Sequence, residues 1–89
     1  MELQGKVAFI TGGGGGIGSG IAEACVEKGM KVVLADIDLD YARAKADELG
    51  ENALAVAIDV TSLESWASAR HTALKHFGTV DVLCNNAGI

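Results

Sequence analysis

A cluster of glycines marks the part of this sequence with the clearest potential for chemistry. The segment TGGGGGIGSG, residues 11–20, contains seven of the twelve glycines in the chain. A glycine-rich turn between a strand and a helix lets the backbone approach a ligand, and the free N–H groups of the helix favour an anion there. Two glycine spacings fit such a loop, G-x-G-x-x-G at Gly13, Gly15 and Gly18, and G-x-x-x-G-x-G at Gly12, Gly16 and Gly18. The cluster therefore indicates a loop that binds a pyrophosphate.

A carboxylate follows this loop at the end of the next apolar run. Asp36 lies eighteen residues after Gly18, where it can accept hydrogen bonds from both hydroxyls of an adenosine ribose. A 2′-phosphate would bring negative charge beside Asp36, and such a pair repels by about 4 kcal/mol at about 4 Å and an effective dielectric of about 20. Residues 12–20 and 37–42 contain no basic side chain, and Arg43 lies a helical turn or more away. We therefore predict that the cofactor is NAD in preference to NADP.

Four apolar runs and three helical patterns must position these residues. The runs at residues 6–11, 31–36, 53–59 and 80–85 are continuous rather than alternating, as in parallel strands covered on both faces. Helical patterns occupy residues 16–28 and 38–49, and a third begins at a capping box formed by Thr61 and Glu64. Gly29, Gly50 and Gly78 are placed to end the three helices.

Apolar spacing predicts which side of two helices faces the sheet. In the first helix the predicted inner residues are Ile17, Ile21, Ala24, Cys25 and Lys28. In the third helix they are Leu63, Trp66, Ala67, Arg70, Leu74 and Phe77. We expect Trp66 and Phe77 to pack in or near the core.

The order β-α-β-α-β-α-β predicts an α/β fold with a Rossmann-like, doubly wound parallel sheet. Because crossovers between parallel strands are right-handed, the expected strand order is 3-2-1-4, and residues 1–89 form a single half-domain. The fourth strand is as apolar as the others, yet this order places nothing on its outer side. We therefore expect the sheet to continue in a longer protein, of which this chain is a C-terminally truncated part.

Composition excludes several classes of function. The chain is 49% hydrophobic and 21% charged, which is typical of a globular protein, and no stretch approaches the ~18–20 apolar residues of a membrane span. The seven Lys and Arg residues are scattered in a chain of net charge −5, so no basic stripe is available for nucleic acid. The N-terminal MELQGKVAFI lacks the basic start and long apolar stretch of a signal peptide, which predicts a cytoplasmic protein.

The cysteines and histidines do not predict a metal or redox site. Cys25 and Cys84 form no Cys-x-x-Cys pair, and we expect two buried, reduced thiols. His71 and His76 are five residues apart, which turns them about 140° from each other on a helix, too far to share a metal. No metal site is therefore predicted.

Two motifs together resemble the short-chain dehydrogenase/reductase family. TGGGGGIG at residues 11–18 is similar to that family's T-G-x-x-x-G-I-G loop, and NNAG at residues 85–88 is similar to its N-N-A-G motif after the fourth strand. The resemblance covers the whole chain and implies a binding site for NAD. Its crevice would lie between strands one and four, where the strand order reverses and where ligands of such sheets bind.

The resemblance also implies a role for individual residues. Those around the pyrophosphate and the adenosine ribose would be Gly12, Gly15, Gly16, Ile17 and Gly18. Asp36 and Ile37 would contact the adenosine end, Asp59 would meet the adenine amino group, and Val60 would pack on the ring. Thr11 would tie the first strand to the N-N-A-G segment, and the path towards the nicotinamide ribose would be lined by Asn85, Ala87 and Gly88.

The family's chemistry implies an oxidoreductase that transfers a hydride between NAD and a small alcohol or carbonyl substrate. Its Ser and Y-x-x-x-K pair lie beyond N-N-A-G, so no catalytic residue is expected within these 89 residues. Tyr41 and Lys45 have the Y-x-x-x-K spacing, but they belong to the helix after the second strand, and we interpret them as a surface pair. Family members are commonly dimers or tetramers, which implies a homo-oligomer for the full-length enzyme.

Two other functions are compatible with the same motifs. The chain could be a stand-alone, non-catalytic dinucleotide-binding module, or a structural fragment that folds only with a partner. An evolved module is expected to protect its fourth strand with Lys or Pro, whereas TVDVLC offers only Asp81. This edge favours the N-terminal part of an enzyme over the module.

Overall fold

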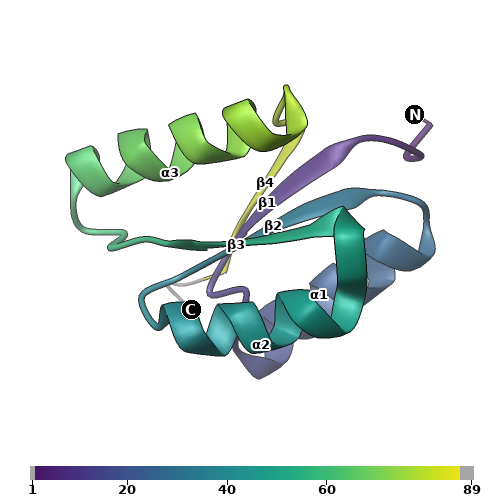
Figure 1. Cartoon of the computed structure of the whole chain (residues 1–89), viewed down its shortest axis with the longest axis horizontal. Helices are drawn as coiled ribbons and strands as arrows, with labels where there is room; N and C mark the ends of the chain where they lie inside the picture. The colour runs from purple at the N-terminus through teal and green to yellow at the C-terminus, as the bar shows by residue number, and fades with distance from the viewer. Residues whose placement is uncertain (1, 87–89) are drawn as a thin grey trace.

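A four-stranded parallel sheet separates one helix from two others in the computed structural model, which describes residues 2–86 (Figure 1). Helix α3 covers one face of the sheet, and α1 and α2 cover the other. The strands are β1 (Val7–Thr11), β2 (Lys31–Asp36), β3 (Ala53–Ala57) and β4 (Val82–Asn85). The helices are α1 (Gly16–Glu27), α2 (Leu39–Leu49) and α3 (Leu63–Phe77), with a 3-10 turn at Gly50–Asn52.

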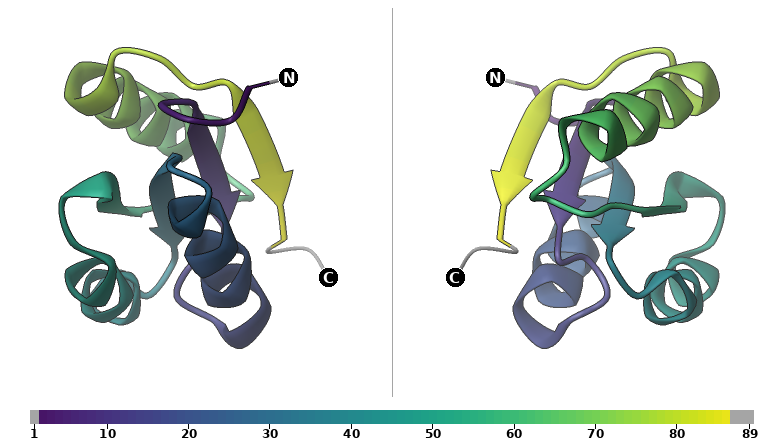
Figure 2. Two further views of the ribbon diagram at one scale, coloured as in Figure 1. Left: turned by 90° about the vertical axis from the view of Figure 1, so that its right-hand side faces the viewer. Right: turned by 90° about the vertical axis from the view of Figure 1, so that its left-hand side faces the viewer.

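The strand order β3-β2-β1-β4 confirms the predicted doubly wound sheet. β1 lies between β2 and β4, and its last residue, Thr11, is in register with Ala35 on one side and Asn85 on the other. All pairings are parallel, so the carboxyl ends of the strands meet at one edge of the sheet (Figure 2). The glycine loop after β1 and Asp36 at the end of β2 both lie at that edge.

Alternate residues of β1 belong to two separate cores. Val7 and Phe9 pack with α3, whereas Ala8 and Ile10 pack with α1 and α2, and none of the four is more than 3% exposed. Each buried Val, Ile or Phe side chain contributes about 1.5–3 kcal/mol relative to its exposed state. Burial on both faces explains why the central strands are apolar without interruption.

The helices end shortly before the predicted glycines. Gly29, Gly50 and Gly78 have φ angles of +83°, +86° and +84°, which side chains with a Cβ rarely adopt. The predicted helices match the structure to within one residue at these ends, because a left-handed residue stops a helix by local geometry alone. The first turn of α2 is capped by Asp38, whose side chain accepts from the Tyr41 N–H at 3.1 Å.

The start of α3 differs from the prediction, because its N-cap is Ser62 rather than Thr61. Ser62 Oγ accepts from the Ser65 N–H at 3.2 Å, and this replaces the predicted capping box with Glu64. Thr61 instead donates its hydroxyl to Asp59 Oδ1 at 2.6 Å. Two adjacent hydroxyl residues can each cap a helix, and here the Asp59 carboxylate engages the first of them.

We expect the substitution Ser62→Ala to lower the free energy of unfolding by about 1 kcal/mol, because it removes the only side-chain acceptor at the start of α3. Urea unfolding followed by circular dichroism measures the change. The matched control is Ser68→Ala, at an exposed position within α3, which should not destabilise the chain. Equal stabilities of Ser62→Ala and the unmodified chain would contradict this N-cap.

The inner face of α3 is also rotated from the predicted one. Ala69 and Ala73 are buried, and Trp66 and Phe77 pack at the margin of the core as expected. Alanine lets the helix backbone approach the sheet closely, so the larger side chains pack along its flanks. Three residues of the predicted inner face are exposed instead: Leu63, Ala67 and Arg70.

α1 shows the same preference for small inner residues. Gly18 and Ala22 are its buried positions, with Ile21 and Cys25 packed beside them. Ile17 is 66% exposed at the start of the helix, beside the glycine loop. The other exposed members of the predicted inner face are Ala24 and Lys28.

Cys25 and Cys84 are free thiols, as predicted, but they are half-buried rather than buried. Both pack beside the core under α1, and β4 is the edge strand, which leaves this margin of the core partly open. Burial raises the pKa of the Cys25 thiol, and Cys84 raises it further. Cys25 is therefore a protonated packing residue at neutral pH rather than a reactive thiolate.

Candidate functional site

The glycine loop joins β1 to α1 in a conformation that requires glycine at three positions. Gly12 has a φ of +67°. A Cβ at Gly13 would lie 2.8 Å from Leu34 Cα, and a Cβ at Gly18 would lie 2.1 Å from the Gly12 carbonyl oxygen. The loop therefore packs backbone against backbone, which draws the start of α1 onto the end of β1.

Asp36 fastens this loop to β2. Its Oδ2 accepts from the Gly14 N–H at 3.1 Å, and its Oδ1 accepts from the Asp38 N–H at 3.0 Å. Each carboxylate oxygen can accept a second bond, so Asp36 retains acceptor capacity for a ligand. The sequence predicted the ligand-binding role of Asp36 but not its bond to Gly14, which spans 22 residues.

At two further positions of the loop, the fold itself does not require glycine. A Cβ at Gly16 would meet nothing within 4 Å, and one at Gly15 would make only an ordinary contact of 3.6 Å with Gly12. Gly15 has φ −80° and ψ 172°, which any residue adopts. The fold leaves open space at these two positions, as expected where a ligand approaches the backbone.

The N-terminus of α1 has no side chain that satisfies its free N–H groups, unlike the N-termini of α2 and α3. No side chain caps it and no acidic residue lies in its first turn, whereas α2 has the cap Asp38 and α3 has the cap Ser62. The first-turn N–H groups of a helix have no intrahelical acceptors and carry a partial positive charge. An anion beside Gly16 and Ile17 would satisfy them.

A cavity of about 310 Å³ is lined on one side by Gly12, whose carbonyl oxygen accepts from the N–H of Gly15, the residue before α1. Its lining comes from Gly12 of the loop, from the end of β2 and from the connection between β3 and α3. Five of its seven lining residues were predicted for the cofactor site, namely Gly12, Asp36, Ile37, Asp59 and Val60, and the other two are Ile58 and Thr61. The fold thus gathers residues from three separate strand ends around one space.

Asp59 is held as an ionised acceptor in the wall of this cavity. Its Oδ1 accepts from the Thr61 N–H at 3.0 Å and from the Thr61 hydroxyl at 2.6 Å. These bonds lower the pKa of the Asp59 carboxyl below its ordinary value. Their contribution to stability is complete above the ordinary Asp pKa and is lost as the pH falls through the lower, folded pKa.

The predicted tie between Thr11 and the segment after β4 is present. The Thr11 hydroxyl oxygen accepts from the Asn86 N–H at 2.9 Å and lies 3.1 Å from Asn85 Oδ1. Asn85 is therefore placed at the same sheet edge as the glycine loop, on the opposite side of β1 from Asp36. Ala87 and Gly88 lie outside the described residues.

The Tyr41 and Lys45 pair in α2 is not arranged for acid–base chemistry. Tyr41 is 57% exposed. Lys45 Nζ is paired with Glu23 of α1 and lies 3.7 Å from Glu48 Oε2, and the hydrogen bond that Lys45 donates to Glu23 raises the pKa of Lys45. Lys45 therefore links α1 to α2.

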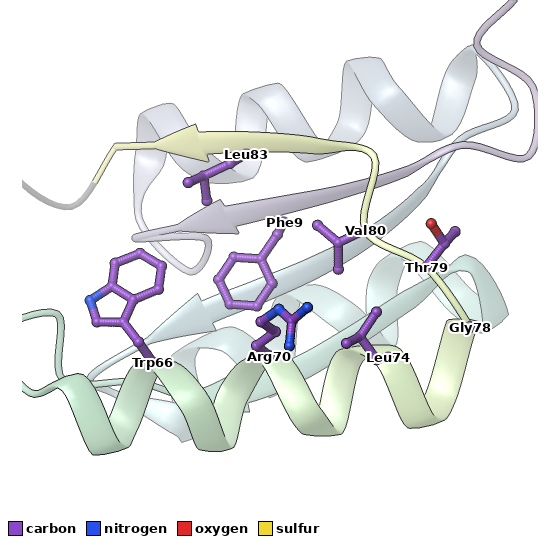
Figure 3. Close-up of a pocket in the computed structure, with 8 residues that line it drawn as sticks. All are labelled: Phe9, Trp66, Arg70, Leu74, Gly78, Thr79, Val80 and Leu83. Atoms are coloured by element: carbon purple, nitrogen blue, oxygen red, sulfur yellow. The ribbon is translucent and has the colours of Figure 1, made fainter.

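A larger cavity of about 390 Å³ lies between α3 and the strands β1 and β4 (Figure 3). Its walls are mainly apolar and include Phe9 and Trp66, whose rings are stacked with centroids 6.1 Å apart. Arg70 and Thr79 contribute polar side chains to this lining. We place the candidate site at the smaller cavity, because its lining combines the carboxylates of Asp36 and Asp59 with Gly12 of the glycine loop.

Residues 2–86 contain neither a cluster of metal ligands nor a membrane-spanning helix. In this part of the chain, no group of three or more His, Cys, Asp or Glu side chains is arranged to hold a metal ion. No helix within the same range combines the length and the hydropathy that a membrane crossing requires.

Comparison with known proteins relates this geometry to a family. The family model of short chain dehydrogenases matches residues 6–89. The chain is 46% identical over 89 residues to sorbitol dehydrogenase from Cereibacter sphaeroides and 44% identical over 89 residues to galactitol 2-dehydrogenase from Agrobacterium fabrum. Each match covers the whole of this chain but only 35% of the length of the relative.

Solved structures give the same relationship. A 3-ketoacyl-(acyl-carrier-protein) reductase from Brucella melitensis, complexed with NADH, superposes with a TM-score of 0.89 at 46% identity, over 91% of this chain and 34% of that one. A short chain dehydrogenase/reductase from Burkholderia phymatum, in complex with NAD, gives 0.88 at 38% identity, over 93% and 31%. Because the family model matches nearly the whole sequence and the fold agrees, the chain belongs to the short-chain dehydrogenase/reductase family.

Proposed function

We propose that this chain is the NAD-binding part of an oxidoreductase that transfers a hydride between NAD and a small alcohol or carbonyl substrate. The observation that carries the proposal is the 310 Å³ cavity, which is lined by Asp36 and by Gly12 of the loop that leads to the uncapped start of α1. The two solved relatives that hold NADH and NAD support this choice of cofactor. The chain matches about a third of its relatives, so the activity is proposed for the complete protein.

The residues present fit the parts of NAD. The pyrophosphate would lie against the first-turn N–H groups of Gly16, Ile17 and Gly18, where Gly12 and Gly15 leave the backbone accessible. An anion requires open space and N–H donors without acceptors, and the first turn of α1 offers both.

The adenosine end would occupy the cavity. Asp36 would accept from the ribose hydroxyls, and the exposed side chains of Ile37 and Val60 would pack on the adenine. Asp59 would accept from the adenine amino group. On the other side of β1, the path towards the nicotinamide ribose would be lined by Asn85, Ala87 and Gly88.

When bound, NAD supplies the hydride chemistry, and this chain's residues orient it at the sheet edge. The proton transfer that accompanies it requires an acid–base group. Tyr41 and Lys45 do not provide one, because Lys45 is paired with Glu23 and Glu48. We propose that the family's Ser and Y-x-x-x-K pair perform this step in the complete enzyme.

We propose NAD rather than NADP because of the charge around the ribose position. The Asp36 carboxylate would face a 2′-phosphate, and no basic side chain compensates for it. Arg43 lines a different cavity together with Gly50 and Leu54, and Lys45 is engaged by Glu23. Neither basic side chain of α2 therefore lines the cavity that holds Asp36.

Calorimetric titration of the unmodified chain is expected to show NADH bound at least about tenfold more tightly than NADPH, because of the repulsion at Asp36. Raising the salt concentration should narrow this ratio, since salt screens the repulsion. Comparable affinities for the two dinucleotides at low salt would contradict the cofactor preference. Failure to bind either one would overturn the proposed function.

A further inference from the structure

The sheet ends at β3, and the outer edge of this strand has no partner strand within residues 2–86. α2 packs on β3 from one face of the sheet and α3 packs on it from the other (Figure 1). Edge strands are commonly protected against pairing by Lys, by other charged side chains or by Pro. Residues 53–57, ALAVA, contain none of these, so the edge of β3 is open to another strand.

Three residues of β3 direct their backbone groups outward, away from β2. The Ile58 N–H donates to the Asp36 carbonyl of β2 at 3.0 Å. Because backbone groups alternate in direction along a strand, every second residue before Ile58 also faces β2, and the residues between them face away. The outward-facing residues are Ala53, Ala55 and Ala57. The Ala53 N–H donates to the Gly50 carbonyl, so the other two alanines retain outward N–H groups for a further strand.

A cavity of about 450 Å³ lies along this edge, between β3 and the flank of α2. Two of its lining residues carry opposite charges, Arg43 and Asp47, and they are four residues apart on the helix. Both are exposed, and neither forms an ion pair within residues 2–86. The open edge is thus flanked by a cation and an anion that have no ion-pair partner in this part of the chain.

This arrangement of charges is self-complementary under a two-fold axis. The bond between the Ala53 N–H and the Gly50 carbonyl brings the end of α2 level with the start of β3. Because α2 connects two parallel strands, it runs antiparallel to β3. A strand rises about 3.3 Å and a helix about 1.5 Å per residue, so Ala55 lies level with a point about four residues before Gly50, between Arg43 and Asp47. A two-fold axis at Ala55 therefore brings Arg43 of one copy opposite Asp47 of the other.

The spacing of the helices also fits a pair of copies. α2 packs on both β2 and β3, so its axis lies inside the edge strand by about half the distance between strands. Neighbouring strands are about 4.8 Å apart, so a second copy paired at β3 would place its α2 about 10 Å from the first. Packed helices lie about 8–10 Å apart. The strands can therefore pair while the two α2 helices contact each other.

We propose that the outer edge of β3 is a self-association surface, at which two copies of this chain pair their β3 strands in antiparallel direction and pack their α2 helices side by side. Ala55 of each copy exchanges two hydrogen bonds with Ala55 of the other, and the Ala57 N–H of each donates to the Ala53 carbonyl of the other. Arg43 and Asp47 form two equivalent ion pairs between the copies. Two four-stranded sheets thereby join into one. This surface shares no lining residue with the cavity proposed to bind NAD.

Sedimentation equilibrium of the unmodified chain is expected to show monomers and dimers in a ratio that depends on concentration. Ala55→Pro should raise the dimer dissociation constant by about a hundredfold, because proline removes the outward N–H and its ring obstructs an approaching strand. The bonds between β3 and β2 do not use this N–H, so circular dichroism should show an unchanged fold.

The matched control is Val82→Pro in β4, at the other edge of the sheet. The Asp81 N–H donates to the Val7 carbonyl of β1 at 2.8 Å, so the N–H of the next residue, Val82, faces away from β1. This variant removes an outward N–H from the opposite edge. It should leave the dissociation constant of the dimer unchanged.

An exchange of charges keeps the test decisive if Ala55→Pro does not fold. Arg43→Asp and Asp47→Arg each place like charges opposite each other in the dimer, and each should raise the dissociation constant by about tenfold. The two substitutions together restore opposite charges and should return the constant to within about threefold of its original value. Arg70→Asp changes the net charge as Arg43→Asp does, but at an exposed position of α3, and should have no such effect.

Three results would overturn the proposal while leaving NAD binding intact. The first is a chain that stays monomeric at every accessible concentration. The second is a dimer that Val82→Pro dissociates and Ala55→Pro does not, because the contact would then lie at β4. The third is a double charge variant that dimerises as weakly as the single variants, because Arg43 and Asp47 would then not face each other. If both proline variants dissociate the dimer, the charge variants decide between the two edges.

Discussion

Replacing Gly18 with alanine is expected to weaken NADH binding by about a hundredfold and to destabilise the chain by roughly 2–4 kcal/mol. The new Cβ would lie 2.1 Å from the carbonyl oxygen of Gly12 and 2.9 Å from its carbonyl carbon. Both are backbone atoms, so the clash is relieved only if α1 moves away from β1. That movement displaces the helix terminus against which the pyrophosphate is proposed to lie. Calorimetry with NADH and urea unfolding measure the two effects.

Substitutions at two other glycines of α1 distinguish an effect on packing from an effect on NADH binding in the same experiment. Gly20→Ala meets nothing within 4 Å and should stabilise the helix by about 0.5–1 kcal/mol with unchanged affinity. Gly16→Ala also has open space, so it should leave the fold intact, but its methyl group should weaken NADH binding where the ligand approaches. If Gly18→Ala binds NADH as tightly as Gly20→Ala does, the close approach of α1 to the loop does not support the cofactor site.

Replacing Asp36 with alanine is expected to weaken NADH binding by about a hundredfold and NADPH binding by much less, so the preference for NADH narrows or disappears. Two hydrogen bonds from the ribose hydroxyls to a charged acceptor are lost, and only NADH loses both. NADPH is relieved of the repulsion at its 2′-phosphate at the same time. The bond that Asp36 accepts from Gly14 is also lost, which loosens the loop for both cofactors.

Asp36→Asn and Asp40→Ala separate the effect of the charge of Asp36 from the effect of the bond that it accepts from Gly14. The asparagine removes the charge but keeps a carbonyl oxygen that can accept from Gly14, so it should narrow the preference with less damage to the loop. Asp40 is an exposed acid in the first turn of α2, and Asp40→Ala removes the same charge without touching the cavity. A ratio of affinities for NADH and NADPH that is the same in Asp36→Ala and in the unmodified chain would refute the role of Asp36.

The sheet could be predicted from the sequence because its signals are local. Four continuous apolar runs match the four strands, and the glycines at 29, 50 and 78 end the helices through their own backbone angles. The handedness of crossovers then fixes the strand order without any side-chain detail. Strand lengths were less well predicted, since Ile58 is buried beyond the end of β3 and extended the apparent run.

The helix faces could not be predicted in the same way. Hydrophobic spacing favoured large residues such as Leu63, whereas Ala69 and Ala73 allow the close approach of α3 to the sheet. The choice of Ser62 over Thr61 as N-cap was equally hidden. It depends on which hydroxyl the Asp59 carboxylate engages, and this is a property of the folded turn.

Much of the candidate site followed from topology. Asp36, Asp59 and the glycine loop each follow a parallel strand, and the ends of parallel strands meet at one edge, so five predicted residues share a cavity. Thr61 was missed, although a Thr two residues after an Asp is a signal for a side-chain turn. The bond between Gly14 and Asp36 had no local signal, because it joins segments 22 residues apart.

The bond from the Trp66 indole to the Val60 carbonyl gives this chain a built-in optical reporter. Trp66 is its single tryptophan, its ring stacks with Phe9, and the carbonyl that it contacts belongs to a residue lining the cavity. Indole emission responds to the polarity and hydrogen bonding around the ring, and reduced nicotinamide absorbs in the same range as that emission. Quenching of the intrinsic fluorescence on addition of NADH should therefore follow occupancy directly, without an attached dye.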